Sequence, residues 1–399
     1  MSRFSRKNES RLNVSNLYNE NEDGAPVVSG ISTFSSPNYF VPPSGSTAER
    51  PSNPGEGMFR FNTDSGHLEY YTGTYWANVI VNNNEVGVST FAAGISAAGT
   101  GTRALFCRGN SNGPTVNRST IDYITVSTFG NAQTFGDDLA VARQGGALAS
   151  STRALIAGRH NANDTISFVT ISSTGDGQDF ANLVSATSSS PAGISNETRG
   201  IFAGGAAPTT ATNKMDYVTI ASQGVHAKDF GNLTIQRANP FGCASSVRGI
   251  IAGGSSPTKQ SSIDYITFSS TGDALDFGDM TSATDNAGMA SNSTRGIFGG
   301  GRTPSTTGLT TIEFITIAST GNATDFGDLL QVRAGGRAAA SSTRLVFGGG
   351  YFPSSPFNDF TNGALESVEI ATTGNGQGFG DLTINREQCP GCSNGHGGL

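Results

Sequence analysis

Residues 293–301 read Ser-Thr-Arg-Gly-Ile-Phe-Gly-Gly-Gly, and similar segments recur through most of the 399-residue chain. Each copy opens on an arginine, continues with apolar residues and ends in glycine. The six arginines lie 46 to 50 residues apart and are Arg103, Arg153, Arg199, Arg248, Arg295 and Arg344. Self-similarity at a period of this length predicts a repeat protein whose units stack on one another.

Three further elements accompany each arginine segment. A stretch such as Ile-Asp-Tyr-Ile-Thr-Phe at 263–268 follows it, and a small, polar stretch such as 336–342 precedes it. The last element carries Phe-Gly-Asp or a variant, with the phenylalanines Phe135, Phe180, Phe230, Phe277, Phe326 and Phe379. Alternation of apolar and polar residues is the pattern of a half-buried strand. Each repeat therefore predicts four short strands, a (small), b (arginine), c and d (Phe-Gly-Asp).

Four strands in a repeat of 40–50 residues are typical of a β-propeller blade. Gly-Gly after strand b, aromatic residues in c and d, and an arginine late in d (Arg143, Arg237, Arg333, Arg386) resemble the kelch repeat. The kelch aromatic pair is closer together and usually includes Trp, unlike this one. The resemblance implies an all-β, kelch-like propeller over residues 90–399.

The end of the chain bears on how such a ring closes. Residues 386–392 align with 237–243, so the last segment predicts a strand a without its own b, c and d. The kelch resemblance implies that residues 387–396 complete the first blade, 102–140, giving six blades of four strands. Residues 90–96 compete for that position, and a seventh, mixed blade is the alternative.

The first ninety residues differ from the repeats. Residues 1–55 have little periodicity and predict an extended arm for attachment, while 56–85 predict a small β-hairpin module. Residues 47–79 resemble a motif of tail-fibre and other virion proteins of tailed bacteriophages, and phages of marine bacteria carry similar Gly-rich kelch-like repeats. The resemblance implies a virion structural protein, a tail fibre or appendage, made in the bacterial host cytoplasm.

That resemblance also implies partners. The arm is expected to bind other virion proteins, and the propeller to bind a host-surface glycan or protein. A homo-oligomer is expected, with a trimer favoured. The alternatives are a carbohydrate-binding lectin or kelch-like enzyme, a cytosolic scaffold and a head decoration protein.

Composition narrows the class of function. The chain has 24 basic and 31 acidic residues, a net charge of −7, and no basic run beyond its first eleven residues, so nucleic-acid binding is not expected. No stretch reaches the roughly 18 apolar residues of a membrane span, and no secretory apolar region follows the N-terminus. No catalytic constellation stands out, which predicts a non-enzyme without a cofactor. Asp-Phe-Gly at 229–231, 276–278 and 325–327 is interpreted as a repeated turn.

Cys389 and Cys392 have the spacing of a redox or metal site. No second cysteine pair accompanies them, and the four histidines form no ligand cluster, so no metal is expected. Cys392 occupies a repeat position held elsewhere by Cys243 or alanine, which favours a small buried residue. A disulfide between Cys389 and Cys392 stays open.

The loops between strands b and c carry nearly all the length variation between repeats, and binding residues tend to lie on such loops. The candidate ligand or receptor contacts are Arg159, His160, Arg302, Tyr351, Phe352, Phe357 and Phe360. The alternative is that these aromatics fold back onto their own blade. For the six repeat arginines, a structural role is favoured, in which each guanidinium binds carbonyls of the neighbouring blade. Anion binding is the other interpretation.

Overall fold

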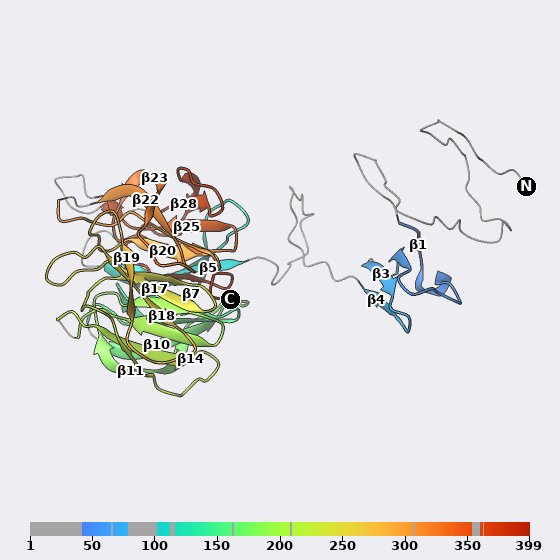
Figure 1. Cartoon of the computed structure of the whole chain (residues 1–399), viewed down its shortest axis with the longest axis horizontal. Helices are drawn as coiled ribbons and strands as arrows, with labels where there is room; N and C mark the ends of the chain where they lie inside the picture. Colours follow the sequence, from blue (N-terminus) through green and yellow to red (C-terminus); the bar gives the residue numbers. More distant parts are fainter. Residues whose placement is uncertain are drawn as a thin grey trace, which may run out of the picture. The chain divides into compact units, whose positions relative to one another are not determined.

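The computed structural model describes residues 42–64, 67–78, 102–111, 116–161, 163–207, 210–305, 308–352, 360–361 and 363–399. The chain divides into two compact units, Met1–Glu85 and Val86–Leu399, which are described separately (Figure 1). The described residues form strands, turns and one 3₁₀ helix, η1 (Thr47–Glu49), which confirms the all-β prediction. No helix in these ranges is long and apolar enough to cross a membrane.

The described residues of unit 1 form one four-stranded sheet, in the order β1 (Ser44–Gly45), β2 (Phe59–Asn62), β3 (His67–Tyr71) and β4 (Trp76–Asn78). Strands β2 and β3 pair antiparallel, which is the hairpin predicted for this stretch. Strand β1 pairs parallel with β2, so folded structure extends into the segment predicted as an extended arm. A buried carboxylate contributes to this order: Glu69 binds Arg50, with Nη2 2.5 Å from Oε2, and ties the chain near η1 to the sheet.

The described part of unit 2 contains six four-stranded antiparallel sheets, numbered here 1 to 6. Sheet 1 is β30 (Gly391–Ser393), β5 (Arg103–Ser111), β6 (Val116–Thr125) and β7 (Gln133–Ala142). Sheet 2 is β8 (Gly146–Ala149), β9 (Arg153–Ala157), β10 (Asn163–Thr170) and β11 (Gln178–Thr187). Sheet 3 is β12 (Ala192–Ser195), β13 (Arg199–Ala203), β14 (Lys214–Thr219) and β15 (Lys228–Asn232).

The remaining sheets repeat this order. Sheet 4 is β16 (Phe241–Ala244), β17 (Arg248–Ala252), β18 (Ser262–Thr267) and β19 (Leu275–Asp279). Sheet 5 is β20 (Gly288–Ser291), β21 (Arg295–Gly299), β22 (Leu309–Thr316) and β23 (Thr324–Arg333). Sheet 6 is β24 (Arg337–Ala340), β25 (Arg344–Gly348), β28 (Ala364–Glu369) and β29 (Gln377–Asp381). In each sheet the four strands are the predicted a, b, c and d.

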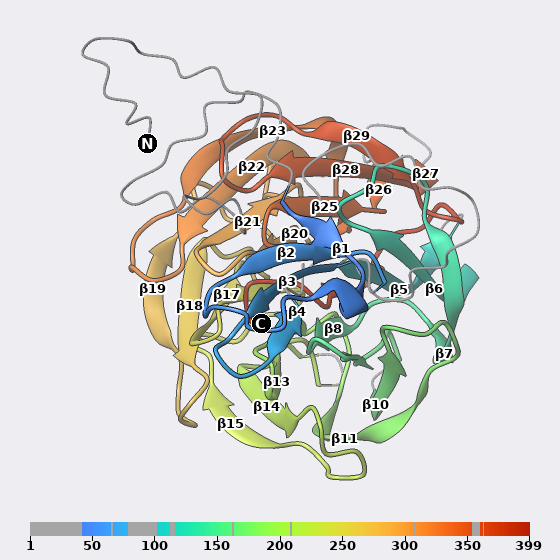
Figure 2. The same cartoon turned by 90° about the vertical axis from the view of Figure 1, so that its right-hand side faces the viewer.

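The last strand completes the first sheet. Strand β30 pairs antiparallel with β5, with Gly391 opposite Phe106 and Ser393 opposite Ala104, which confirms the pairing expected for the final segment. The first strands of the sheets contact one another in the cyclic order β8, β12, β16, β20, β24, β30 and back to β8. Figure 2 shows the sheets of unit 2 arranged around a common centre, an arrangement consistent with propeller-like blades. Residues 90–96, the competing segment, lie outside the described residues.

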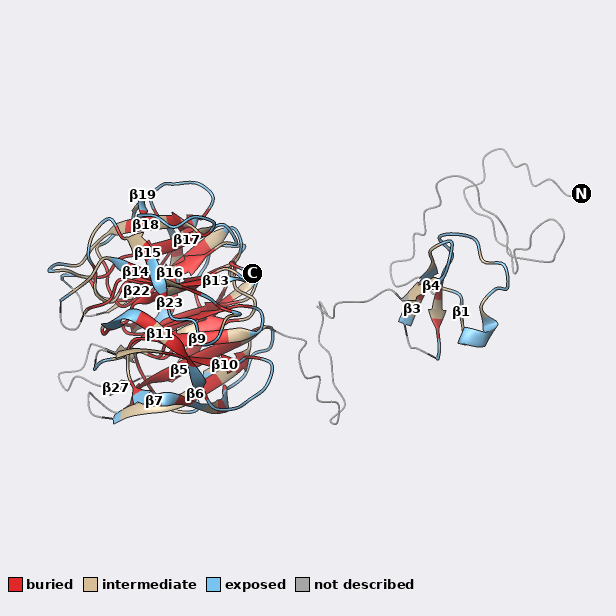
Figure 3. Cartoon of the chain, turned by 90° about the horizontal axis from the view of Figure 1, so that it is seen from below, coloured by how far each residue is buried: buried red, intermediate tan, exposed pale blue. Residues whose placement is uncertain are grey.

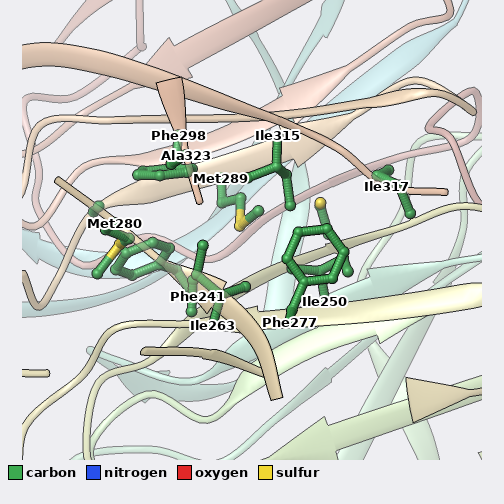
Figure 4. Close-up of a cluster of buried hydrophobic side chains, with 13 residues drawn as sticks. Phe241, Ile250, Ile263, Phe277, Met280, Met289, Phe298, Ile315, Ile317 and Ala323 are labelled. Atoms are coloured by element: carbon green, nitrogen blue, oxygen red, sulfur yellow. The ribbon is translucent and has the colours of Figure 1, made fainter. Parts of the chain in front are cut away.

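Hydrophobic side chains fill the space between neighbouring sheets, and Figure 3 shows that the strands of unit 2 carry many buried residues. Successive residues of a strand face opposite sides of its sheet. Ile250 of β17 therefore packs in a cluster with sheet 5, whereas Ile251 packs in another with sheet 3. Figure 4 shows the first of these clusters, in which Phe241 and Phe277 of sheet 4 meet Met289 and Phe298 of sheet 5. Every sheet needs both neighbours to bury its apolar faces.

Candidate functional site

The six repeat arginines join each sheet to the next. In each case Nη1 donates to backbone carbonyls just after strand c of the following sheet. The acceptors are Ile171 for Arg103 (3.0 Å), Ile220 for Arg153 (3.2 Å), Phe268 for Arg199 (2.5 Å), Ile317 for Arg248 (3.1 Å), Ile370 for Arg295 (3.1 Å) and Val126 for Arg344 (3.1 Å). The set is cyclic, because the last arginine reaches sheet 1. These are the contacts expected if the arginines have a structural role, binding carbonyls of the neighbouring sheet. They occupy N–H donors that a bound anion would need.

Each of these guanidinium groups also lies over an aromatic ring. In sheets 1 to 5 the ring belongs to strand c of the same sheet, for example Tyr265 at 4.7 Å from the Arg248 carbon Cζ. Sheet 6 has Ser367 at that position, and Phe129 of sheet 1 takes the place of the missing ring, 4.4 Å from Arg344. Phe129 also packs on Phe379, with ring centroids 5.3 Å apart. Cation–π contact of this kind adds to the inter-sheet hydrogen bonds.

Three arginines, located at the end of strand d or a few residues after it, form buried ion pairs with the next sheet. Their partners lie on strand c: Arg237 with Asp264 (3.0 Å), Arg333 with Glu366 (2.6 Å) and Arg386 with Asp122 (2.9 Å). All six side chains are almost completely buried. Arg143, grouped with these arginines in the sequence, does not join them. Its Nη2 lies 3.2 Å from Nε2 of His160 instead, and Arg108 pairs with Asp138 at that junction.

Two junctions carry the acid without the arginine. Thr187 and Thr284 occupy the arginine position, opposite the buried carboxylates of Asp216 and Glu313. The Glu313 carboxylate accepts hydrogen bonds from Thr281, whose Oγ1 lies 2.5 Å away. Burial raises the pKa of Asp216 to about 6, although backbone N–H groups of Val184 and Ser185 counteract it.

The predicted contact residues separate into two places. Arg302 makes a two-pronged ion pair with Asp285, at 3.0 and 2.7 Å, and Lys259 lies 3.7 Å from the same carboxylate. Tyr351 lies beside Arg302: burial raises the pKa of the Tyr351 hydroxyl, and the charge and hydrogen bond of Arg302 lower it in part. The loops between strands b and c of sheets 4, 5 and 6 therefore bring Arg302 and Tyr351 together, beside Asp285 of the connection that enters sheet 5.

Arg159 and His160 form no part of that group. The N–H of Arg159 donates to the carbonyl of Thr187 (3.2 Å), and His160 packs beside Arg143. Burial and the Arg143 charge both lower the pKa of His160. Phe352 and Phe360 belong to the short strands β26 (Tyr351–Phe352) and β27 (Phe360–Thr361), which pair with each other. Their side chains and the whole of Phe357 lie outside the described residues.

A ring of left-handed residues was not predicted. A residue two positions before the innermost strand, or three before β30 in sheet 1, has a positive φ in all six sheets. The residues are Gln144 (66°), Ser190 (44°), Asn239 (52°), Asn286 (57°), Gly335 (66°) and Gln388 (53°), called here the left-handed ring. Backbone N–H groups link five of its members: Gln144 to the Gln388 carbonyl (3.2 Å), Gln388 to Gly335 (2.8 Å), Gly335 to Asn286 (3.1 Å) and Asn286 to Asn239 (3.4 Å). Asn239 in turn donates to the carbonyl of Ser189, the residue before the sixth member (3.0 Å). Asn and Gly are the sequence signal for this conformation, and only three of the six positions carry it.

The innermost strands enclose a cavity of about 40 Å³, lined by small residues such as Ala149, Ser195 and Ser291. His396 lies at the end of this cavity away from the left-handed ring. Its Nε2 is 2.8 Å from the carbonyl oxygen of Ala149, and its Nδ1 accepts the N–H of Gly398 at 3.0 Å. These bonds define the neutral imidazole with hydrogen on Nε2. The residues after β30 thus close one end of the cavity.

The four cysteines are buried free thiols. Cys389 and Cys392, the pair with redox spacing, pack into different hydrophobic clusters, so no disulfide joins them. Burial raises the pKa of Cys243 to about 12. Within the described ranges, no group of three or more His, Cys, Asp or Glu residues is placed to hold a metal ion.

Comparison with known proteins adds no relative from which a role for these residues follows. No protein-family model and no curated protein sequence matches this chain.

Proposed function

We propose that unit 2 is a six-bladed, kelch-like β-propeller. Three observations support this assignment: the repeated four-stranded sheets, the cyclic contacts between their innermost strands, and the pairing of β30 with β5. The arginine contacts follow the same cycle, since Arg344 of sheet 6 binds sheet 1 as Arg248 of sheet 4 binds sheet 5. Closing a ring with strands from both ends of the chain fixes each sheet between two neighbours.

This propeller is a binding module of a phage virion structural protein, a tail fibre or appendage, and has no enzymatic role. The sequence resemblance of residues 47–79 and of the repeats supports the virion assignment. Unit 1 provides the attachment to other virion proteins, and unit 2 provides the surface for a host glycan or protein. A homo-oligomer, with a trimer favoured, would present several such surfaces at once and raise avidity.

One observation carries the binding role: loops from three sheets bring Arg302, Lys259 and Tyr351 together around Asp285. Arginine and tyrosine are, with tryptophan, enriched among the residues that carry most of the binding energy at protein interfaces. The contacts of the six repeat arginines lie at the ends of the sheets where strand a leads into strand b and strand c leads into strand d. The b–c loops lie at the opposite ends of the sheets, so these contacts leave them free to differ between repeats.

Purified particles test the virion assignment. We expect mass spectrometry to detect this chain in density-purified virions, and antibody labelling in electron micrographs to locate it on the tail. Labelling on the capsid would replace the tail assignment with that of a head decoration protein. Absence of the chain from purified particles overturns the proposal.

A second experiment tests the binding surface. Purified chain should bind host cells, and Arg302→Ala should weaken that binding. Lys228→Ala is the matched control, because it removes one exposed positive charge on β15, outside the b–c loops. Equal binding by wild type and Arg302→Ala removes this group of residues from the binding surface.

A further inference from the structure

The segment 394–399, called here the axial plug, follows the closing strand β30 and lies across one end of the central cavity. It binds innermost strands of sheets other than its own. The N–H of Gly397 donates to the carbonyl oxygen of Ser291 in sheet 5 at 2.9 Å, and Nε2 of His396 donates to that of Ala149 in sheet 2 at 2.8 Å. Sheets 2 and 5 lie opposite each other in the cyclic order, so the plug spans the axis of the ring.

Two glycines of the plug fit where no side chain has room. A Cβ on Gly397 would collide with the carbonyl oxygens of Asn292 and Ala244, and a Cβ on Gly398 would collide with the carbonyl oxygen of Ser195. Both glycines are buried. Backbone can approach backbone this closely only where a Cβ is absent. The plug therefore fits the end of the cavity in one conformation, which its anchoring contacts must maintain.

His396 anchors that conformation through both of its ring nitrogens. While Nε2 donates to Ala149, Nδ1 accepts the N–H of Gly398 at 3.0 Å. The two bonds together require the neutral imidazole, with its single proton on Nε2. A second proton would put an N–H on Nδ1 against the N–H of Gly398. One hydrogen bond would then be lost and two donors would face each other, so a protonated His396 does not suit the closed plug.

The surroundings of His396 favour the neutral form. Burial lowers the pKa of the imidazole, whereas the Ala149 carbonyl and the Glu197 carboxylate raise it in part. Glu197 lies in the turn between β12 and β13. The other titratable side chains that line the cavity are the thiols of Cys243 and Cys392, and burial raises the pKa of Cys243 to about 12. Among the described residues, Glu197 is therefore the charged group that partly stabilises a protonated His396.

We propose that the axial plug is a pH-sensitive lid, which closes one end of the central cavity while His396 is neutral and is released when His396 takes up a proton. Release frees residues 397–399 and opens the cavity at that end. The ring itself stays closed, because β30 precedes the plug and keeps its pairing with β5. The inference rests on contacts within unit 2, so it holds or fails separately from the virion assignment.

Hydrogen exchange of the full chain tests the proposal, measured by mass spectrometry at pH 7.5 and 5.5 and corrected for the intrinsic exchange rate at each pH. The amides of Gly397 and Gly398 report on the plug, because both donate hydrogen bonds in the closed form. A group whose pKa is lowered in the closed form stabilises that form above its ordinary pKa, about 6.5 for histidine, and less as pH falls below it. We expect the protection of these amides to fall about tenfold between the two pH values. Protection of β8 and β12 should stay unchanged, since the ring remains folded.

Three variants separate the titration of His396 from a merely structural role. His396→Gln keeps a donor for Ala149 and takes up no proton, so protection of its plug should be the same at both pH values. Glu197→Gln removes the charge that favours protonation and should move the fall in protection to lower pH. His67→Gln, in unit 1, is the matched control and should behave as wild type. Equal plug protection at pH 7.5 and 5.5 in wild type, the wild-type fall in His396→Gln, or an equal loss in β8 and β12 overturns the proposal.

Discussion

Nη1 of Arg344 lies 3.1 Å from the carbonyl oxygen of Val126, and this bond joins the last sheet of unit 2 to the first. The residues are 218 positions apart in sequence. The same guanidinium reaches the carbonyl of Ser127 at 3.3 Å and lies over Phe129. One side chain thus combines three contacts across the junction between sheets 6 and 1.

Replacing Arg344 with alanine should destabilise unit 2. The variant loses the charged hydrogen bonds to Val126 and Ser127 and the cation–π contact with Phe129, all of which join sheet 6 to sheet 1. We expect a loss of about 1–3 kcal/mol in the free energy of unfolding, measured by urea denaturation. Arg344→Lys keeps the positive charge but lacks the planar guanidinium, so its free energy of unfolding should lie between those of wild type and Arg344→Ala. If Arg344→Ala were as stable as wild type, the association of sheet 6 with sheet 1 would not depend on the contacts of Arg344.

Breaking a buried ion pair should cost more. Arg386→Met leaves the Asp122 carboxylate, which is fully buried, without its cation. The expected loss is about 3–5 kcal/mol. The double variant Arg386→Met/Asp122→Leu removes the stranded charge and should recover part of that loss. A double variant as unstable as the sum of the single variants would show that the two side chains are not coupled.

At the junction that contains Asp216, an ion pair can be added instead of removed. Thr187→Arg supplies the cation that Arg237, Arg333 and Arg386 provide elsewhere, and should bring the pKa of Asp216 below its present value of about 6. Because that pKa is raised above the ordinary 3.8, the contribution of Asp216 to stability is lost as pH rises from about 4 through 6. The variant should therefore gain melting temperature most at pH 7–8. A drop in melting temperature at every pH would show that the junction has no space for the guanidinium.

His396 should make stability fall in acid. Burial lowers the pKa of its imidazole, although the Ala149 carbonyl and Glu197 raise it in part. The stability it contributes is present above its ordinary pKa of about 6.5 and is lost as pH falls below that value. A proton on Nδ1 would also face the N–H of Gly398. His396→Gln keeps a donor for Ala149 and should flatten the melting temperature between pH 7.5 and 5, whereas His67→Gln in unit 1 should not. Parallel curves for wild type and His396→Gln would contradict this role.

The repeats made most of the strands predictable. Arginine, Asp-Tyr and Phe-Gly-Asp recur in register, so each sheet could be drawn from sequence, and the alignment of 386–392 with 237–243 identified the closing strand. The pairing of Arg237 with Asp264 was not predictable, because the two residues belong to neighbouring repeats and meet only when the sheets pack.

Other features leave no pattern in the sequence. The left-handed ring uses Gln, Ser, Asn and Gly at one structural position, because its conformation is held by backbone hydrogen bonds between sheets. In sheet 6 the position of the aromatic residue under the repeat arginine is Ser367, and Phe129, from a distant part of the chain, provides the ring for Arg344 instead. Arg337 occupies a position that other repeats fill with small residues, Phe241 or Pro390, so the repeat pattern gives no reason for its charge.

An experimental structure of the full chain tests the central claim, that six sheets form one ring closed by its last strand. The account predicts residues 391–393 hydrogen-bonded antiparallel to 104–106, with Arg344 bound to the Val126 carbonyl. Residues 90–96 in that position, or a seventh sheet between β29 and β5, would contradict it.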